Sequence, residues 1–146
     1  MSYADKAKEI FKTGCNCSQA VFAAFSDVLG IDETMAKRVS VGLGGGVGRM
    51  REVCGAVSGG AMVLGMIYGG ENGEDKGSAY AKVQDFANEF KKESGSIICR
   101  EILALDKEKK ETPKPDERTE QYYKVRPCAD KVYDAAKIIE QMIAQK

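Results

Sequence analysis

The chain has 146 residues, 43% of them hydrophobic, so it is long enough for one ordinary domain with a buried core. Its 22 Lys and Arg residues balance its 22 Asp and Glu residues, which argues against a nucleic-acid or anionic-membrane surface. Histidine is absent, which excludes catalysis by a histidine base, histidine-bound zinc and c-type haem, so a metal would need Cys, Asp, Glu, Met or backbone ligands.

The predicted elements are all helices, because no run of alternating polar and apolar residues indicates a strand. We expect an all-α single domain over residues 1–146, with about six to seven helices. The first is an amphipathic helix over 3–12. It is too polar for a secretory signal peptide, which predicts a cytoplasmic chain. Asn16 begins a capping-box pattern for a helix over 17–29, and Asp32 caps another that runs to about residue 41.

The middle of the chain is rich in glycine. Residues 42–48 form a turn that follows a helix and lacks the glycine spacing of a nucleotide-binding loop. Residues 54–68 form an apolar helix whose small residues let neighbouring helices approach closely. The uncharged run over 53–70 is at the lower limit of membrane-spanning length, but its six glycines favour a buried central helix, so no membrane partner is expected.

The C-terminal half is more polar. Residues 78–93 form an amphipathic helix, and a short helix runs through 99–105. Eleven of the fifteen residues from 106 to 120 are charged, so 106–121 is predicted to be a solvated surface loop within the domain. Pro127 opens the last helix at a position where a missing N–H costs nothing.

Four cysteines, far apart in the chain, each lie at the start of a predicted helix: Cys17, Cys54, Cys99 and Cys128. The N–H groups and dipole at a helix start favour negative charge, which lowers a thiol's pKa and favours the thiolate that binds metals and attacks disulfides. We therefore expect Cys54 to have a pKa below the free value of about 8.5. Cys15 lies outside the helix start and could be a spare ligand, a resolving thiol or simply a small residue.

Three arginines are close to these cysteines in sequence. Arg51 and Arg100 are expected to stabilise a thiolate or an anionic cluster, whereas Arg49 is interpreted as a surface arginine or the partner of a nearby glutamate. The cysteines have no Cys-x-x-Cys spacing, so spacing alone does not choose between metal binding, thiol chemistry and an inert buried role.

Five segments in order resemble the C_GCAxxG_C_C family of redox-active proteins, found mainly in anaerobic bacteria and archaea: 16–21, 44–50, 53–59, 99–101 and 127–128. The resemblance runs from about residue 4 to residue 143. It implies a small α-helical domain whose characteristic cysteines are Cys17, Cys54, Cys99 and Cys128, whereas Cys15 stands where the family more often has an aromatic residue. Similar cysteine patterns occur in multihaem cytochromes that carry an iron–sulfur centre, which favours metal ligation by analogy.

The expected function is therefore electron transfer or redox sensing through an iron–sulfur cluster, without haem. The four cysteines would meet near the glycine-rich turn and be its ligands, and Arg51 and Arg100 would tune it from outside the ligand set. Two alternatives stay open: a metal-free thiol–disulfide redox protein and a zinc-stabilised interaction module. The expected partner is a redox protein, with a homodimer as a further option, and whether the chain is an enzyme is left open.

Overall fold

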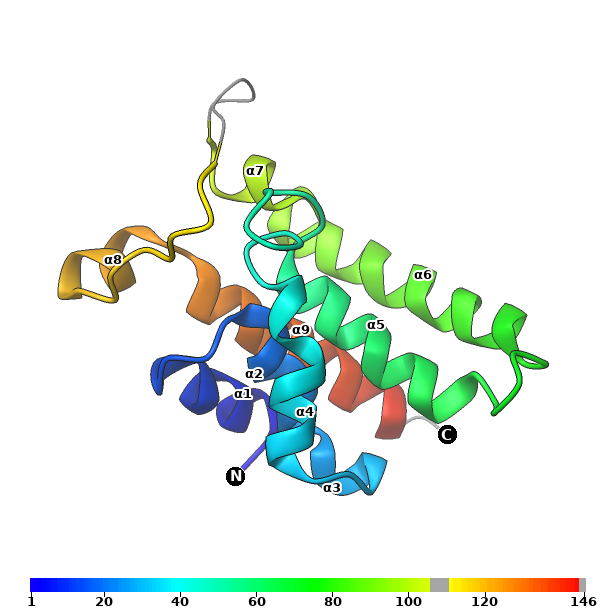
Figure 1. Cartoon of the computed structure of the whole chain (residues 1–146). Coiled ribbons are helices and arrows are strands. Elements are labelled where there is room, and N and C mark those ends of the chain that lie inside the picture. The colour runs from blue at the N-terminus through cyan, green and yellow to red at the C-terminus, as the bar shows by residue number, and fades with distance from the viewer. Residues whose placement is uncertain (106–110, 145–146) are drawn as a thin grey trace.

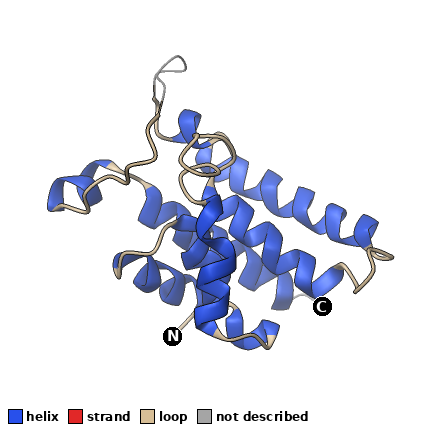
Figure 2. Ribbon diagram, viewed as in Figure 1, coloured by secondary structure: helices blue, strands red, loops and turns tan. Residues whose placement is uncertain are grey.

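The computed structural model describes residues 1–105 and 111–144, and within these ranges the chain is all helical with no strand (Figure 2). This confirms the predicted all-α fold. The helices are α1 (Tyr3–Lys12), α2 (Cys17–Ala24), α3 (Ser26–Leu29), α4 (Glu33–Ser40), the 3₁₀ helix η1 (Val41–Leu43), α5 (Gly55–Tyr68), α6 (Lys76–Ser94), α7 (Cys99–Ile102), α8 (Glu120–Val125) and α9 (Cys128–Ala144).

The helix ends lie close to where the caps predict them. At the start of α2 the Gln19 N–H donates to Asn16 Oδ1 at 3.0 Å, and the Asn16 N–H donates to Gln19 Oε1 at 2.9 Å, which completes the capping box. The predicted helix over 17–29 divides at Phe25, whose φ of −100° and ψ of 10° leave the helical region, so two helices replace one. Short helices such as α3 explain why the described residues contain more helices than were predicted.

The glycine-rich helix α5 packs against α2 on one side and α6 on the other, and α9 contacts all three (Figure 1). The helix α2 also packs against α1 and α4, so α2 is more central than α5, which was the predicted central helix. A Cβ atom at Gly59 would lie 2.7 Å from the Ser18 carbonyl oxygen, and one at Gly60 would lie 2.5 Å from the Phe86 ring. Missing side chains on α5 therefore let two helices approach its backbone closely.

The core lies between these helices, and its largest fully buried side chains are Phe11, Phe25, Phe86, Phe90, Leu64 and Ile139. The first and last helices are joined directly, since the Tyr3 N–H donates to Glu140 Oε1 at 2.6 Å and Lys8 Nζ lies 3.3 Å from Asp130 Oδ1. Among the helices of the described ranges, none combines the length and the apolar character that crossing a membrane requires.

Candidate functional site

The glycine-rich turn between η1 and α5 has left-handed backbone over five consecutive residues, 45–49, with φ between 56° and 76°. Two of them, Val47 and Arg49, carry side chains, and Arg51 also has a φ of 64°. A left-handed conformation costs an L-residue about 1–2 kcal/mol. Backbone hydrogen bonds across the turn hold this geometry, among them those from the Arg51 N–H to the Gly45 carbonyl at 2.9 Å and from the Glu52 N–H to the Gly46 carbonyl at 2.8 Å.

An isolated antiparallel bridge follows the turn and brings two cysteines together. Val53 pairs with Ile98; the Cys54 N–H donates to the Ile97 carbonyl at 2.8 Å, and the Cys99 N–H donates to the Glu52 carbonyl at 2.6 Å. The chain after α6 reaches this position because Gly95, with a φ of 80°, ends that helix. The starts of α5 and α7 therefore lie side by side, as Figure 1 shows.

Cys17 reaches the same place through the start of α2. The side chain of its N-cap residue Asn16 donates to the Val41 carbonyl at 2.9 Å, which ties the start of α2 to η1. A Cβ atom at Gly55, the first residue of α5, would lie 3.1 Å from the Cys17 Cβ. The absence of a side chain at this position therefore permits close contact between the two helix starts.

All four cysteines singled out from the sequence line one cavity of about 520 Å³, together with Gly44, Gly45 and Gly48 of the turn. Each cysteine lies at a helix start, as predicted: Cys54 precedes α5, and Cys17, Cys99 and Cys128 are the first residues of α2, α7 and α9. Cys17 and Cys128 interact most strongly of the four, since each shifts the pKa of the other. All five cysteines of the chain are free thiols.

Cys15 has a different environment. Its carbonyl oxygen accepts a hydrogen bond from Arg118 Nη2 at 2.8 Å, and its side chain packs on the edge of the core.

The prediction that Cys54 has a low pKa is wrong. Burial raises the pKa of the Cys54 thiol to about 12, although the N–H groups of Ala56 and Val57 act in the opposite direction. Cys54 is 6% exposed, so the loss of hydration outweighs the N–H groups of the helix start. Burial also raises the pKa of Cys99 against the opposing effect of Arg51, and the hydrogen bond to Cys128 raises the pKa of Cys17.

Cys128 is the acidic thiol of the site. The hydrogen bond from Cys17 lowers the pKa of Cys128 to about 7, with smaller contributions from the Tyr122 hydroxyl and the charges of Arg126 and Arg118, and burial opposes them. Because two hydrogen-bond donors and two arginine charges act on one sulfur, Cys128 carries thiolate near neutral pH while the other three thiols stay protonated.

This order of acidity predicts the alkylation of the metal-free protein. The thiolate is the reactive form and its fraction increases as pH rises through the pKa, so Cys128 should react with a midpoint near pH 7, whereas Cys54 should stay unmodified through pH 10. Iodoacetamide labelling from pH 5 to 10, read by peptide mass spectrometry, measures both. Equal labelling of the two cysteines at pH 8 would contradict the assignment.

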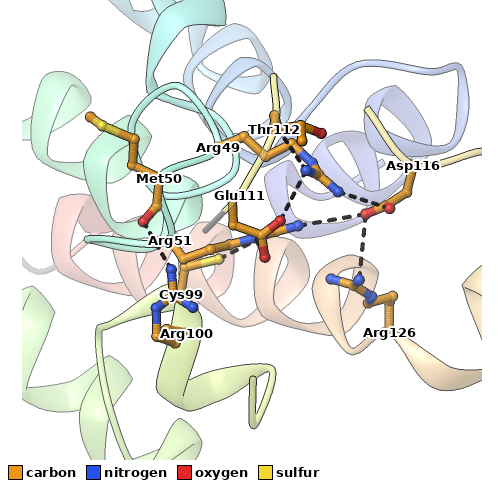
Figure 3. A network of polar contacts seen from close by, with 9 residues as sticks. All are labelled: Arg49, Met50, Arg51, Cys99, Arg100, Glu111, Thr112, Asp116 and Arg126. Carbon is orange, nitrogen blue, oxygen red and sulfur yellow. Dashed lines mark hydrogen bonds and ion pairs between the residues drawn. The ribbon is translucent and has the colours of Figure 1, made fainter. Parts of the chain in front are cut away.

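A charged network closes over the turn (Figure 3). Arg49 Nη1 lies 3.0 Å from Glu111 Oε2 and Arg49 Nη2 lies 2.9 Å from Asp116 Oδ1. Arg51 Nε lies 3.3 Å from Glu111 Oε1, and Arg51 Nη1 donates to Cys99 Sγ at 3.7 Å. The Arg51 and Glu111 side chains are 5% and 7% exposed, so this pair is buried.

This network corrects two interpretations from the sequence. The loop predicted over 106–121 is tied to the turn by Glu111 and Asp116, although most of its described residues are exposed; residues 106–110 lie outside the described residues. Arg49 is bound to these two carboxylates, with 18% of its side chain exposed, rather than being a solvated surface residue.

Three residues that line the cavity were missed by sequence reasoning: Arg118, Tyr122 and Arg126. Arg118 donates to the Phe11 carbonyl at 3.0 Å and its Cζ lies 4.1 Å from the centroid of the Phe11 ring, so it fixes the charged loop to α1. Arg126 Nη2 lies 3.4 Å from Asp116 Oδ2. Of these three residues, only Arg126 could have been suspected from the sequence, because it is two residues from Cys128.

The two arginines predicted to tune the site are placed differently. Arg51 reaches Cys99, whereas Arg100 Nη2 donates to the Met50 carbonyl at 3.5 Å. Figure 3 shows both. Arg100 does not appear among the described residues that line the cavity, and its tuning role stays a prediction.

The described residues form a small all-α protein with a cavity that is lined by four cysteine thiols and several arginines. The family model described as "Putative redox-active protein (C_GCAxxG_C_C)" matches residues 15–142, and the chain belongs to this family. No curated protein and no solved structure matches the chain.

Proposed function

We propose that this chain transfers electrons or senses redox state through an iron–sulfur cluster held by Cys17, Cys54, Cys99 and Cys128. The observation that carries the proposal is convergence, because thiols from the starts of four different helices line one cavity. Four cysteine thiolates are the ordinary ligand set of [2Fe–2S] and [4Fe–4S] clusters, which supply reversible one-electron chemistry when bound.

The surroundings of the cavity support an anionic centre. Arg49, Arg51, Arg118 and Arg126 all line it, and Arg51 already donates to the sulfur of Cys99. Thiolate ligands give a cluster negative charge, and hydrogen bonds to the sulfurs set its potential. These arginines would therefore favour the ligated thiolates, which burial alone disfavours.

The spacing of the thiols bears on the choice between a cluster and a single ion. No group of three or more Cys, Asp or Glu side chains in 1–105 and 111–144 is spaced to hold one metal ion. An ion at about 2.3 Å from each sulfur of a tetrahedron requires sulfurs only about 4 Å apart. A cluster binds its cysteines through different iron atoms and so accepts wider spacing, which favours it over the zinc alternative.

A metal-free thiol–disulfide protein is the second candidate, and one pair of thiols favours it. Cys17 and Cys128 line the same cavity, and each shifts the pKa of the other, so these two cysteines are the pair that would form a disulfide. Cys128 would be the attacking thiolate and Cys17 the resolving thiol. Both candidates imply a redox partner protein, and a homodimer stays a prediction.

Anaerobic reconstitution with iron and sulfide tests the proposal. We expect the protein to become brown, and Cys→Ser at position 17, 54, 99 or 128 to reduce bound iron sharply, because each variant removes one ligand. Cys15→Ser is the matched control and should bind iron like the unmodified chain. The loaded protein should melt at a higher temperature than the metal-free protein, since binding to the native state adds stability.

A different result separates the two candidates. If iron does not bind, and only Cys17→Ser and Cys128→Ser abolish disulfide exchange while the variants at 54 and 99 retain it, the cluster proposal is wrong and the second candidate holds.

A further inference from the structure

We propose that residues 111–119 form a releasable strap, which ion pairs hold as one wall of the thiol cavity and whose release opens the cavity to reactants. The strap leads directly into α8. Four of its residues line the cavity: Pro113, Pro115, Asp116 and Arg118. The inference goes beyond the proposed function, because access to the thiols matters equally to a cluster and to a disulfide pair.

Side chains, and not backbone pairing, attach the strap to the rest of the molecule. Among the described residues, no hydrogen bond between backbone groups joins 112–118 to a helix or to the glycine-rich turn. Residues 112–117 are all exposed, so the strap buries little apolar surface. The free energy of opening such a segment is small and is set by its few side-chain contacts.

Asp116 makes most of these contacts, as Figure 3 shows. Its carboxylate lies 2.9 Å from Arg49 Nη2 and 3.6 Å from Arg51 Nη2. Arg126 Nη2, at the end of α8, lies 3.4 Å from the same carboxylate. The Asp116 side chain is 37% exposed, so dissolved salt screens these pairs far more than it screens a buried pair. The attachment of the strap should therefore weaken as ionic strength rises.

Arg118 is the second attachment and also a direct reporter of release. Its guanidinium donates to the Cys15 carbonyl at 2.8 Å and to the Phe11 carbonyl at 3.0 Å. Trypsin must take this same side chain into its own binding pocket, so it can cut after Arg118 only while the strap is detached. When reattachment is faster than cutting, the cleavage rate measures the detached fraction. Lys114 precedes a proline and gives trypsin no competing site in the strap.

Arg49→Gln tests the attachment. It removes a cation that binds Asp116 and the Thr112 carbonyl, the latter at 2.7 Å, and it leaves unchanged the strap sequence that trypsin reads. Arg38→Gln is the matched control, because it removes the same charge from an exposed position on α4 that forms no ion pair with the other described residues.

Each full-length protein is digested briefly with trypsin, both metal-free and after anaerobic reconstitution, in about 0.05 to 1 M NaCl. Mass spectrometry follows the cut after Arg118, and a synthetic peptide of residues 112–124 corrects for the effect of salt on trypsin. Far-UV circular dichroism and thermal melting show whether each variant is folded.

Labelling of Cys99 with N-ethylmaleimide at one fixed pH measures access to the cavity of the metal-free protein. Cys99 lines the cavity and is 8% exposed, and the reagent carries no charge. Loss of a nearby cation lowers the fraction of thiolate and by itself slows the reaction. Faster labelling of Cys99 in Arg49→Gln therefore reports an opened cavity and not a more reactive thiol.

We expect Arg49→Gln to accelerate both reactions about five- to tenfold at low salt, since the loss of its charged contacts changes the detached fraction by about that ratio. In the unmodified chain 1 M salt should accelerate both severalfold, and Arg38→Gln should match the unmodified chain. If iron does not bind but both rates rise in Arg49→Gln, the cluster proposal fails and this inference holds.

Three results would overturn the inference: unchanged cleavage in a folded Arg49→Gln protein, cleavage that rises without faster labelling, or an equal rise in Arg38→Gln. If Arg49→Gln does not fold, the salt series of the unmodified chain decides, and rates that stay constant from low to high salt overturn the inference.

Discussion

A Gly46→Ala protein should lose about 3 kcal/mol of unfolding free energy and most of its capacity to bind iron. Gly46 has a φ of 76°, and a Cβ atom there would lie 2.5 Å from the Glu52 nitrogen and 2.8 Å from the Arg51 Cα. Those atoms are backbone of the segment that leads directly to Cys54, so they cannot move aside as a side chain could. Relief of the clash must displace the bridge that brings Cys54 beside Cys99.

Gly48→Ala is the matched control for this variant. Gly48 has a φ of 56° in the same turn, but a Cβ atom there would meet nothing within 4 Å. The Gly48→Ala variant should lose only about 1 kcal/mol of unfolding free energy, from the strain of its left-handed backbone, and should still bind iron. Urea unfolding and iron content of the reconstituted proteins measure both effects. Equal losses in the two variants would show that strain, and not the clash with the backbone, decides the outcome.

An Arg51→Met protein should lose about 2–4 kcal/mol of unfolding free energy, because it leaves a buried carboxylate short of a partner. Arg51 and Glu111 are both almost fully buried, and Arg51 also reaches Asp116 at 3.6 Å. Arg49 still binds Glu111 in the variant, which keeps the loss below that of a completely unpaired buried charge. The variant also removes the donor to Cys99, so the loaded protein should be easier to oxidise.

Lys92→Met provides the comparison at the surface. Lys92 pairs with Glu89 at 2.9 Å, but the two side chains are 73% and 56% exposed, and such pairs contribute less than about 1 kcal/mol. Urea denaturation of both variants at the same salt concentration gives the two free energies. If Arg51→Met were as mild as Lys92→Met, the buried network would contribute nothing to the fold.

Most of the fold could be predicted from local signals. Asn16 and Gln19 mark the start of α2 because a capping box satisfies its own backbone groups within four residues, and Gly95 ends α6 because it adopts a positive φ. The break at Phe25 had no such signal. The Phe25 ring is fully buried and stacks on Tyr3 at 4.5 Å, and this distant packing accompanies the division of the predicted helix.

Of the candidate site, only the cysteines that could act as ligands were predictable from the sequence. The four cysteines share helix starts, which a sequence pattern can show, and the structure places them around one cavity. The low pKa expected of Cys54 was wrong because burial depends on the packing of other helices. Arg118 lies in a stretch whose charge indicated exposure, and its role arises from contacts with α1 that no local spacing encodes.

The residues that line the cavity are far apart in the sequence, since Cys17 begins the second helix and Cys128 begins the last helix, α9. During synthesis, domains fold as units once their parts are available, and translation adds residues at roughly 5–20 per second. A nascent chain that has not released α9 lacks one wall of the cavity and the helix to which Tyr3 binds through Glu140. The complete set of thiols can therefore assemble only after Cys128 and α9 have been synthesised, and the N-terminal helices alone cannot form the cavity.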